Sequence, residues 1–289
     1  MTTKEILKKV RKIEIKARGL SSHIFSGEYH SAFKGRGMSF AEVREYSPGD
    51  DVRTIDWNVT ARLSSPYIKT FEEERELTVI LMIDISNSTI FGSAARSKRE
   101  MATELAAVLA FSATTNNDKV GVIFFSDKVE HYIPPQKGKS HVLRIIRELI
   151  ARQPQPGSRT DLSCALEFLN NVMRKRCTTF LVSDMIAPPY QKPLQMAARK
   201  HDLTGIQIYD LLDASLPDVG LLEVQDAEMN RSLVIDTSDR HTRRDYAATF
   251  LRHCKYSKDT FVKSGAQLMA IRTDQDYVKA LQGFFRSRI

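Results

Sequence analysis

The amino-acid sequence predicts an α/β fold, a doubly wound and mostly parallel β-sheet flanked by helices. The main observation is the run Thr78–Ile83, six consecutive apolar or β-branched residues. Such a run is typical of a strand that is buried on both faces of a parallel sheet. A second apolar run, Phe180–Val182, ends in polar residues in the same way. Strand-like and helix-like segments alternate after Thr78, which indicates strand–helix–strand units.

The chain begins with a basic segment for which the apolar spacing predicts a helix over residues 3–18. Ile6, Leu7, Val10 and Ile13 form one stripe. Seven Lys or Arg against two Glu in residues 1–20 give a net charge of +5, out of +8 for the whole chain. Such a helix could lie on nucleic acid or on an anionic membrane. Because the stripe lacks Trp and Phe, we favour a helix docked on the core with its Lys-rich face in water.

Residues 27–62 differ in composition, since glycines and the pair Pro48-Gly49 indicate tight turns and irregular backbone. Charged residues crowd around the single tryptophan, Trp57, which suggests a network of ion pairs. We expect a short helix over residues 52–62, and a strand antiparallel to Thr78–Ile83, or a lead-in to it, over residues 66–77. The predicted domains are an irregular N-terminal extension over residues 1–76 and a sheet domain over residues 77–289, with the extension packed on the sheet domain.

The remaining elements follow from hydrophobic period and turn residues. Helices are expected over residues 94–114, 161–174, 190–200, 240–263 and 275–286, strands over residues 120–125, 128–133, 178–183, 204–209 and 267–271, and a hairpin over residues 221–235. Residues 137–140 resemble the end of a Walker A motif, but Ile133 stands where that motif requires Gly. We interpret these four residues as the start of a helix.

Polar side chains follow the strand that begins at Thr78. Asp84, Ser86 and Ser88 alternate along the chain, so in extended backbone their side chains project to one side. Open α/β sheets bind ligands at the carboxyl ends of their strands. Oxygen ligands of this kind suit a hard cation such as Mg²⁺. The alternative is an ordinary turn rich in Ser and Asn.

Two further polar residues lie in loops that connect strands and helices of the predicted fold. Thr160 lies in a polar loop that opens a predicted helix, and Asp184 ends the second apolar strand. The pattern Asp84-x-Ser86-x-Ser88, Thr160 and Asp184 resembles the metal-ion-dependent adhesion site of von Willebrand factor A domains. The resemblance implies Mg²⁺ or Mn²⁺ held by the three hydroxyls, with the two acids acting largely through water. It also implies an open coordination position that receives an Asp or Glu from a protein partner.

A second resemblance lies in residues 27–62. The motifs Gly-x-x-x-Ser-x-x-x-Gly-x-Gly-x-x-Phe, Arg-x-Tyr-x-x-Gly-Asp-Asp-x-Arg-x-Ile-Asp-Trp and Ala-Arg resemble the signature of the domain-of-unknown-function family 58. The match extends from about Gly27 to about Asp239 and is best to the short, soluble form of that family. It implies a von Willebrand factor A-like domain that accompanies a MoxR-type AAA+ ATPase and helps it to remodel, assemble or activate client proteins.

Several classes of function find little support in the sequence. The sequence has no run of 18 apolar residues, the length that spanning a membrane requires. The N-terminus lacks the features of a signal peptide, so we expect a cytoplasmic protein. The three cysteines, Cys164, Cys177 and Cys254, lack metal-ligand spacing. The seven histidines are dispersed, and neither Gly-x-Ser-x-Gly nor His-Glu-x-x-His occurs.

The sequence therefore favours a non-enzymatic, metal-dependent protein-interaction module. One alternative is a metal-dependent hydrolase acting on phosphoesters, because a metal with carboxylates could activate water. The other is a basic nucleic-acid-binding protein, which rests on the net charge of +8 and on the basic N-terminus. No nucleic-acid recognition motif supports that alternative.

Overall fold

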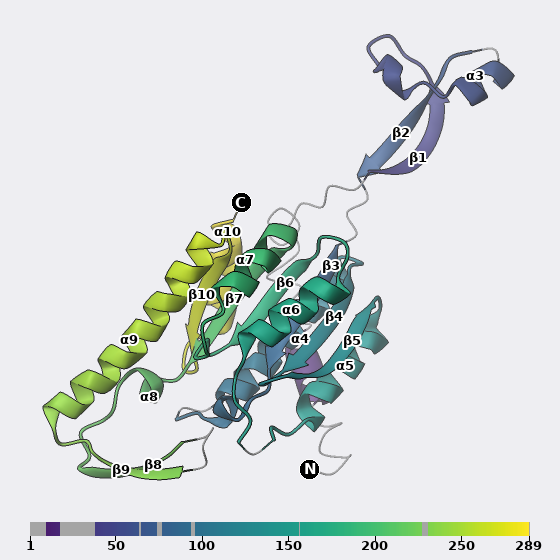
Figure 1. Cartoon of the computed structure of the whole chain (residues 1–289). Helices are drawn as coiled ribbons and strands as arrows, with labels where there is room; N and C mark the ends of the chain where they lie inside the picture. Colours follow the sequence, from purple (N-terminus) through teal and green to yellow (C-terminus); the bar gives the residue numbers. More distant parts are fainter. Residues whose placement is uncertain are drawn as a thin grey trace. The chain divides into compact units, whose positions relative to one another are not determined.

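The computed structural model describes residues 10–17, 38–63, 65–73, 77–93, 96–155, 157–226 and 231–288. The chain divides into two compact units (Figure 1), of which the smaller is Phe33–Glu76 and the larger is Met1–Ala32 with Leu77–Ile289. Some expectations lie outside the described residues: the ends of the helix over 3–18, residues 27–37 of the family signature, and the hairpin turn at 227–230.

The larger unit is built on a six-stranded sheet with the strand order β10-β7-β6-β3-β4-β5. The strands are β3 (Thr78–Asp84), β4 (Lys119–Phe125), β5 (Val129–Gln136), β6 (Thr178–Ser183), β7 (Asp202–Tyr209) and β10 (Gln267–Arg272). Neighbouring strands are parallel except for β4 and β5, which form an antiparallel pair. Residues 79–84 of the central strand β3 are all buried, as expected for a strand covered on both faces.

Helices cover both faces of this sheet. They are η2 (Asn87–Ile90), α4 (Lys98–Thr115), α5 (Lys139–Ala151), α6 (Leu162–Val172), α7 (Gln191–Lys200), α8 (Leu211–Ala214), α9 (Arg240–Lys263) and α10 (Tyr277–Arg286). Ile80, Met82 and Leu181 pack in one cluster with residues of α6, α7 and α9, the helices in front of the sheet in Figure 1. Phe180 points to the other face and meets Phe285 of α10 with ring centroids 6.3 Å apart. The predicted fold class, a doubly wound and mostly parallel sheet, is confirmed.

The described part of the N-terminal helix, residues 10–17, docks on the larger unit. Val10 and Ala17 are buried. Lys16 Nζ lies 2.6 Å from Glu104 of α4, and Glu14 pairs with Lys139 of α5 at 2.7 Å. The docked helix is therefore the correct interpretation for these residues, although some of its charged side chains form ion pairs rather than facing only water.

The smaller unit is a two-stranded antiparallel ribbon of β1 (Met38–Glu45) and β2 (Tyr67–Glu73) with the short helices η1 (Val52–Thr54) and α3 (Trp57–Leu63). Two corrections apply here. The alternative in which residues 66–77 pair antiparallel with the strand at Thr78 is wrong, because β2 pairs with β1. The helix expected over residues 52–62 is interrupted. Ile55 is extended and bridges to Ile68, and the Asp56 carboxylate then accepts from the amide of Asn58 at the start of α3.

The expected ion pairs of this unit are present in part. Arg44 binds Asp50 through both guanidinium nitrogens, at 2.9 and 2.7 Å, and Asp56 pairs with Lys69 at 3.2 Å. The Trp57 side chain is 71% exposed and lies outside any described core.

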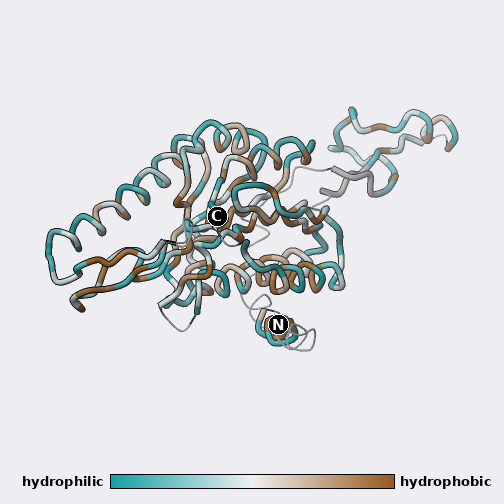
Figure 2. Tube along the Cα trace, turned by 60° about the horizontal axis from the view of Figure 1, so that its bottom comes forward, coloured by the Kyte–Doolittle hydropathy of each residue, from teal (hydrophilic) through white to brown (hydrophobic). Residues whose placement is uncertain are grey.

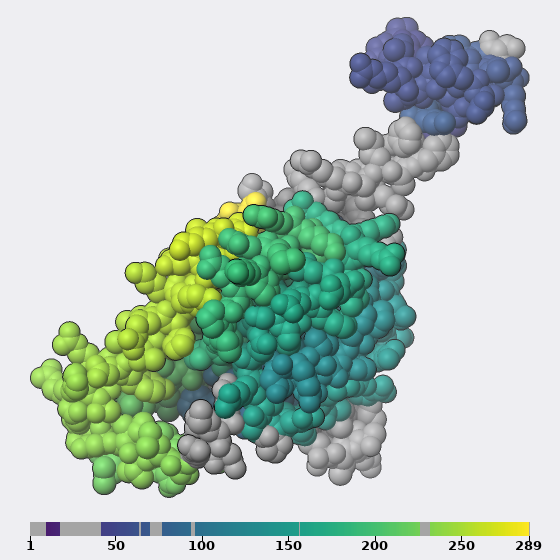
Figure 3. All heavy atoms as spheres, in the orientation of Figure 1, coloured from purple at the N-terminus to yellow at the C-terminus, as the bar shows by residue number. Residues whose placement is uncertain are grey.

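The hairpin of β8 (Leu221–Asp226) and β9 (Arg231–Asp236) precedes α9, the longest described helix. Helix α9 is hydrophilic along most of its length (Figure 2), and its seven Lys or Arg against two Asp give it a net charge of +5. With the hairpin it forms the yellow-green end of the larger unit (Figure 3). No described helix has the length and apolarity that crossing a membrane requires.

Candidate functional site

The candidate site lies at the carboxyl ends of the two central strands. From β3 the chain continues to β4 on one side, and it later returns through α6 to β6 on the other side. The order of the strands therefore reverses between β3 and β6, which is where ligands bind in open α/β sheets. Asp84 is the last residue of β3, and Asp184 follows the last residue of β6.

Three hydroxyl groups from two loops converge at this point. Ser86 Oγ lies 3.0 Å from Ser88 Oγ and accepts a hydrogen bond of 2.9 Å from Thr160 Oγ1. Ser86 and Thr160 are buried although 74 residues separate them in the sequence. The turn that holds Ser86 and Ser88 is closed by Thr89, whose hydroxyl donates to the Ser86 carbonyl at 2.7 Å. The structure thus brings Ser86, Ser88 and Thr160 into one hydrogen-bonded group, which we call the hydroxyl cluster.

Asp84 borders the hydroxyl cluster and is held in a single orientation. Its Oδ1 accepts from the Ser86 amide at 2.8 Å, and its Oδ2 accepts from Ser183 Oγ at 2.7 Å. Burial, together with the negative charge of Asp184, raises the pKa of Asp84 to about 6 despite these hydrogen bonds. A positive charge placed close to Asp84 would therefore favour its ionised form.

Asp184 is bound by a lysine that the sequence analysis did not identify. Asp184 Oδ2 lies 3.0 Å from Lys98 Nζ, and its Oδ1 accepts from the Ile186 amide at 3.2 Å. Lys98 Nζ also lies 3.2 Å from Asp213 Oδ2. Burial works to lower the pKa of Lys98, but the two carboxylates outweigh it and raise that pKa above its ordinary value. Asp184 is therefore linked to the site through charge, and no described hydrogen bond joins it to the hydroxyl cluster.

The donor set is compatible with a hard divalent cation. Asp84, Asp184 and Asp213 carry three negative charges when ionised, and Lys98 carries one positive charge, so the formal sum is −2. The hydroxyl cluster adds three neutral oxygen donors, the ligand type that Mg²⁺ and Mn²⁺ prefer. No described group of three or more His, Cys, Asp or Glu could hold a metal ion. The sequence predicted Asp84, Ser86, Ser88, Thr160 and Asp184 as the ligands of such an ion, and the structure places Asp84 beside the hydroxyl cluster through the Ser86 amide.

Three residues at the site were missed: Lys98, Ser183 and Asp213. The available sequence signal for Lys98 is its position at the first turn of an otherwise Ala-rich, largely buried helix. That helix begins with a capping box between Ser97 and Glu100, which fixes the register that turns Lys98 inward.

A separate polar group lies nearby, at the end of β7. The Asp210 carboxylate accepts from the Ser93 amide at 3.0 Å, from the Ser93 hydroxyl, and from Thr273 Oγ1 at 2.7 Å. Burial opposes ionisation, but these hydrogen bonds lower the pKa of Asp210 to about 2. With its carboxylate saturated by donors, Asp210 ties three segments together.

The surroundings of the site combine apolar and polar surface. Ile90 and Phe91, two and three residues after Ser88 in the chain, are 52% and 43% exposed. A small cavity of about 200 Å³, lined in part by Ile85, Arg152 and Ser158, lies beside the residue that precedes Ser86. Exposed apolar side chains close to polar groups offer contact surface to another protein.

Comparison with known proteins gave one family and several relatives. The model of the family described as "Protein of unknown function DUF58" matches residues 42–256. Uncharacterized proteins of Mycobacterium tuberculosis and Mycobacterium bovis are each 32% identical over 284 residues, which is 96% of this chain and 88% of theirs.

Two solved structures are similar to part of the chain. The conserved hypothetical protein BatB from Bacteroides thetaiotaomicron matches with a TM-score of 0.48 and 16% identity, over 73% of this chain and 98% of its own. The VWA domain of SpRpn10 matches with a TM-score of 0.41 and 13% identity, over 71% of this chain and 93% of its own.

Proposed function

The chain belongs to the DUF58 family of proteins of unknown function, and from this premise we propose that it is a non-enzymatic protein-interaction module whose site takes up Mg²⁺ or Mn²⁺. The observation that carries the proposal is the hydroxyl cluster of Ser86, Ser88 and Thr160, which lies beside the buried carboxylate of Asp84. The bound cation would supply positive charge that attracts a carboxylate from a partner protein.

The chain's own residues have distinct tasks in this proposal. The three hydroxyls supply neutral oxygen ligands, and Asp84 and Asp184 balance charge, largely through water. Mg²⁺ takes six ligands and retains several waters in proteins, so a position remains for an incoming Asp or Glu. Lys98 fixes Asp184 at 3.0 Å and so holds this carboxylate in place before any ligand arrives.

The exposed side chains of Ile90 and Phe91 indicate which side chains the partner should present. Ile90 and Phe91 are exposed beside the site, so the acidic residue of the partner should be flanked by an apolar side chain. The family resemblance nominates a MoxR-type AAA+ ATPase, or a client on which it acts, as this partner. Attraction between opposite charges near a protein surface is worth up to about 4 kcal/mol before desolvation costs, which can gate a complex but not hold it alone.

The contacts of the serines support an interaction site over a catalytic one. A serine nucleophile needs a general base within hydrogen-bond reach. In the described contacts, Ser86 Oγ bonds the hydroxyls of Ser88 and Thr160 and no histidine. Two hydroxyls that bond each other are suited to a ligand sphere and gain nothing as nucleophiles.

The test is capture of partners from the native cell with the immobilised full-length protein, in Mg²⁺ and in chelator. Thr160→Val removes one hydroxyl of the cluster and keeps the shape of the side chain. Thr114→Val is the matched control, because Thr114 Oγ1 bonds only the Ala110 carbonyl within α4. We expect wild type and Thr114→Val to retain the same proteins in Mg²⁺ and to release them in chelator, whereas Thr160→Val retains none. Identical partners under all conditions would contradict the proposal.

A further inference from the structure

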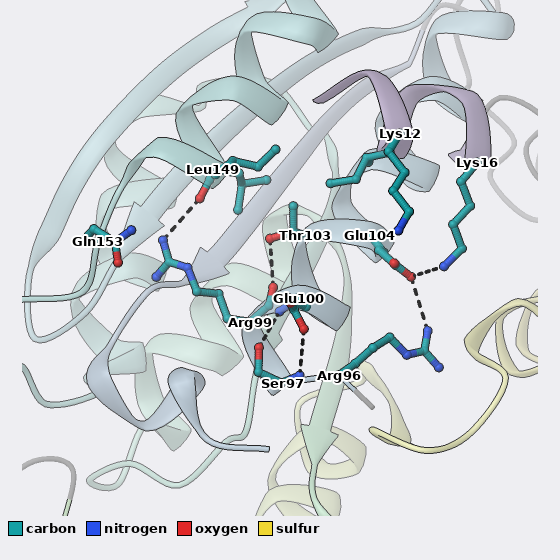
Figure 4. Close-up of a pocket in the computed structure, with 12 residues that line it drawn as sticks. Lys12, Lys16, Arg96, Ser97, Arg99, Glu100, Thr103, Glu104, Leu149 and Gln153 are labelled. Atoms are coloured by element: carbon teal, nitrogen blue, oxygen red, sulfur yellow. Dashed lines mark hydrogen bonds and ion pairs between the residues drawn. The ribbon is translucent and has the colours of Figure 1, made fainter. Parts of the chain in front are cut away.

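A second cavity, of about 450 Å³, lies in the larger unit between the helical segment 10–17, α4 and α5 (Figure 4). This volume is in the range of small-molecule pockets. None of the residues that line it belongs to the hydroxyl cluster or contacts it through a described hydrogen bond. The cavity is therefore a different place on the molecule from the proposed metal site.

Arg99 is the central feature of this cavity. Its Nη2 donates to the Leu149 carbonyl at 3.2 Å, the bond drawn in Figure 4, but its Nη1 is buried without any hydrogen-bond partner. Burial lowers the pKa of the Arg99 guanidinium, and no carboxylate offsets this effect. Arg99 as a whole is half-buried, so its guanidinium has lost part of its water and has gained no described ion pair in return. An anion in the cavity would offset this loss.

The other charged groups of the lining leave a positive excess. Lys12, Lys16, Arg96 and Arg99 give four positive charges, and Glu100 and Glu104 give two negative charges, so the sum is +2. Glu104 is already taken by Lys16 at 2.6 Å and Arg96 at 3.3 Å. Glu100 caps α4 by accepting from the Ser97 amide at 3.2 Å. Lys12 and Arg99 are therefore the cations of the lining that no described carboxylate neutralises.

Apolar side chains form another part of the wall, namely Ile13, Leu149 and Ile150. We propose that the cavity binds a small phosphate monoester with an apolar body. A phosphate monoester carries about −1.5 to −2 charges at neutral pH, which matches the excess of the lining. Arg99 Nη1, which has no described hydrogen-bond partner, can donate to phosphate oxygens, Lys12 adds a second positive charge, and the apolar wall takes the organic group.

The experiment is calorimetric titration of the full-length protein at physiological ionic strength with hexyl phosphate as the probe. Inorganic phosphate tests the contribution of the apolar wall, and hexanol tests that of the charges. We expect saturable binding of hexyl phosphate, at least about tenfold tighter than that of either comparison compound. Arg99→Gln should weaken it about tenfold or more, because charged hydrogen bonds are lost.

A pair of variants on the N-terminal helical segment provides the matched control. Lys12 lines the cavity, whereas its neighbour Arg11 is exposed and does not. Lys12→Gln should weaken hexyl phosphate binding severalfold and Arg11→Gln should leave it unchanged. Absence of saturable binding to wild type, or equal weakening by Lys12→Gln and Arg11→Gln, would overturn the proposal. Lys12→Gln and Arg11→Gln also test the proposal if Arg99→Gln fails to fold, because Lys12 and Arg11 are both exposed and their replacement should leave the fold intact.

Discussion

Lys98 Nζ lies 3.0 Å from Asp184 Oδ2, and the side chains of both residues are at least 95% buried. The same ammonium is 3.2 Å from Asp213 at the start of the segment that follows β7. A fixed positive charge therefore joins α4 to the residue that follows β6 and to α8. Any ligand of the site meets a carboxylate that is already oriented, and this arrangement has a measurable consequence for stability.

Replacing Lys98 with Met should destabilise the protein strongly. The change keeps the volume of the side chain but leaves the buried Asp184 and the partly buried Asp213 without their counter-charge. Loss of a buried partner of this kind costs about 3–5 kcal/mol. The matched control is Lys16→Met, because Lys16 also forms an ion pair, at 2.6 Å with Glu104, but is 44% exposed. That pair is worth about 0–1 kcal/mol. Urea unfolding monitored by circular dichroism measures both, and similar losses in the two variants would show that Lys98 is not the structural cation we infer.

The packing between β7 and α9 gives a second prediction. A Cβ atom at Gly205 would lie 2.5 Å from two ring atoms of Phe261, which is fully buried. Gly205→Ala should therefore lower the free energy of unfolding by about 1–3 kcal/mol through overpacking. A Cβ at Gly283 of α10 meets no atom within 4 Å. Gly283→Ala should instead raise stability by about 0.5–1 kcal/mol, because Ala favours the helix. Thermal unfolding should rank Gly283→Ala above wild type and Gly205→Ala below it, and the reverse order would refute this account.

The sequence allowed prediction of those site residues whose position follows from a single strand and its end. The buried runs that end at Asp84 and Asp184 made both acids predictable, because strand ends at one edge of a parallel sheet must be neighbours. Lys98 could not be found in this way, since its pairing with Asp184 joins positions 86 residues apart. The pairing of β2 was misjudged for a related reason. Alternation identifies a strand, but the choice between two partners, β1 and β3, depends on contacts that no local pattern encodes.

His201 should make stability depend on pH. Burial, together with the charges of Lys200 and Arg176, lowers the pKa of His201 to about 4. Its Nδ1 lies 3.2 Å from Cys177 Sγ, and its Nε2 is buried without a partner. The unfolded chain, with a histidine pKa of about 6.5, binds the proton more readily than the folded protein does. Stability is therefore full above about pH 6.5 and falls as the pH drops from there to about 4, by at most about 3 kcal/mol.

Urea unfolding at several pH values tests this expectation with two variants. His201→Gln should flatten the decline between pH 6.5 and 4, even if it lowers stability at every pH. His241→Gln is the control, because the His241 side chain is 80% exposed. It should keep the slope of the wild type. A decline of unchanged steepness in His201→Gln would assign the acid sensitivity to other groups.

The last prediction concerns the metal itself. If the hydroxyl cluster holds the ion, Mg²⁺ or Mn²⁺ should raise the unfolding temperature of the protein, because a ligand of the folded state stabilises it by about 2.7 kcal/mol at a hundred times its dissociation constant. Ser86→Ala should abolish this rise, since Ser86 Oγ is the atom that both other hydroxyls contact. Ser112→Ala is the matched control, because the Ser112 hydroxyl is buried in α4 with no hydrogen-bond partner. It should keep the full rise.

Lys98→Met adds an independent arm to the same measurement. Loss of the ammonium changes the formal charge of the site from −2 to −3. The metal-induced rise should therefore be larger in Lys98→Met than in wild type, although the variant starts from a lower temperature. This outcome separates a site that attracts a cation through its carboxylates from adventitious binding elsewhere on the surface. An equal rise in wild type, Ser86→Ala and Lys98→Met would place the ion outside the hydroxyl cluster.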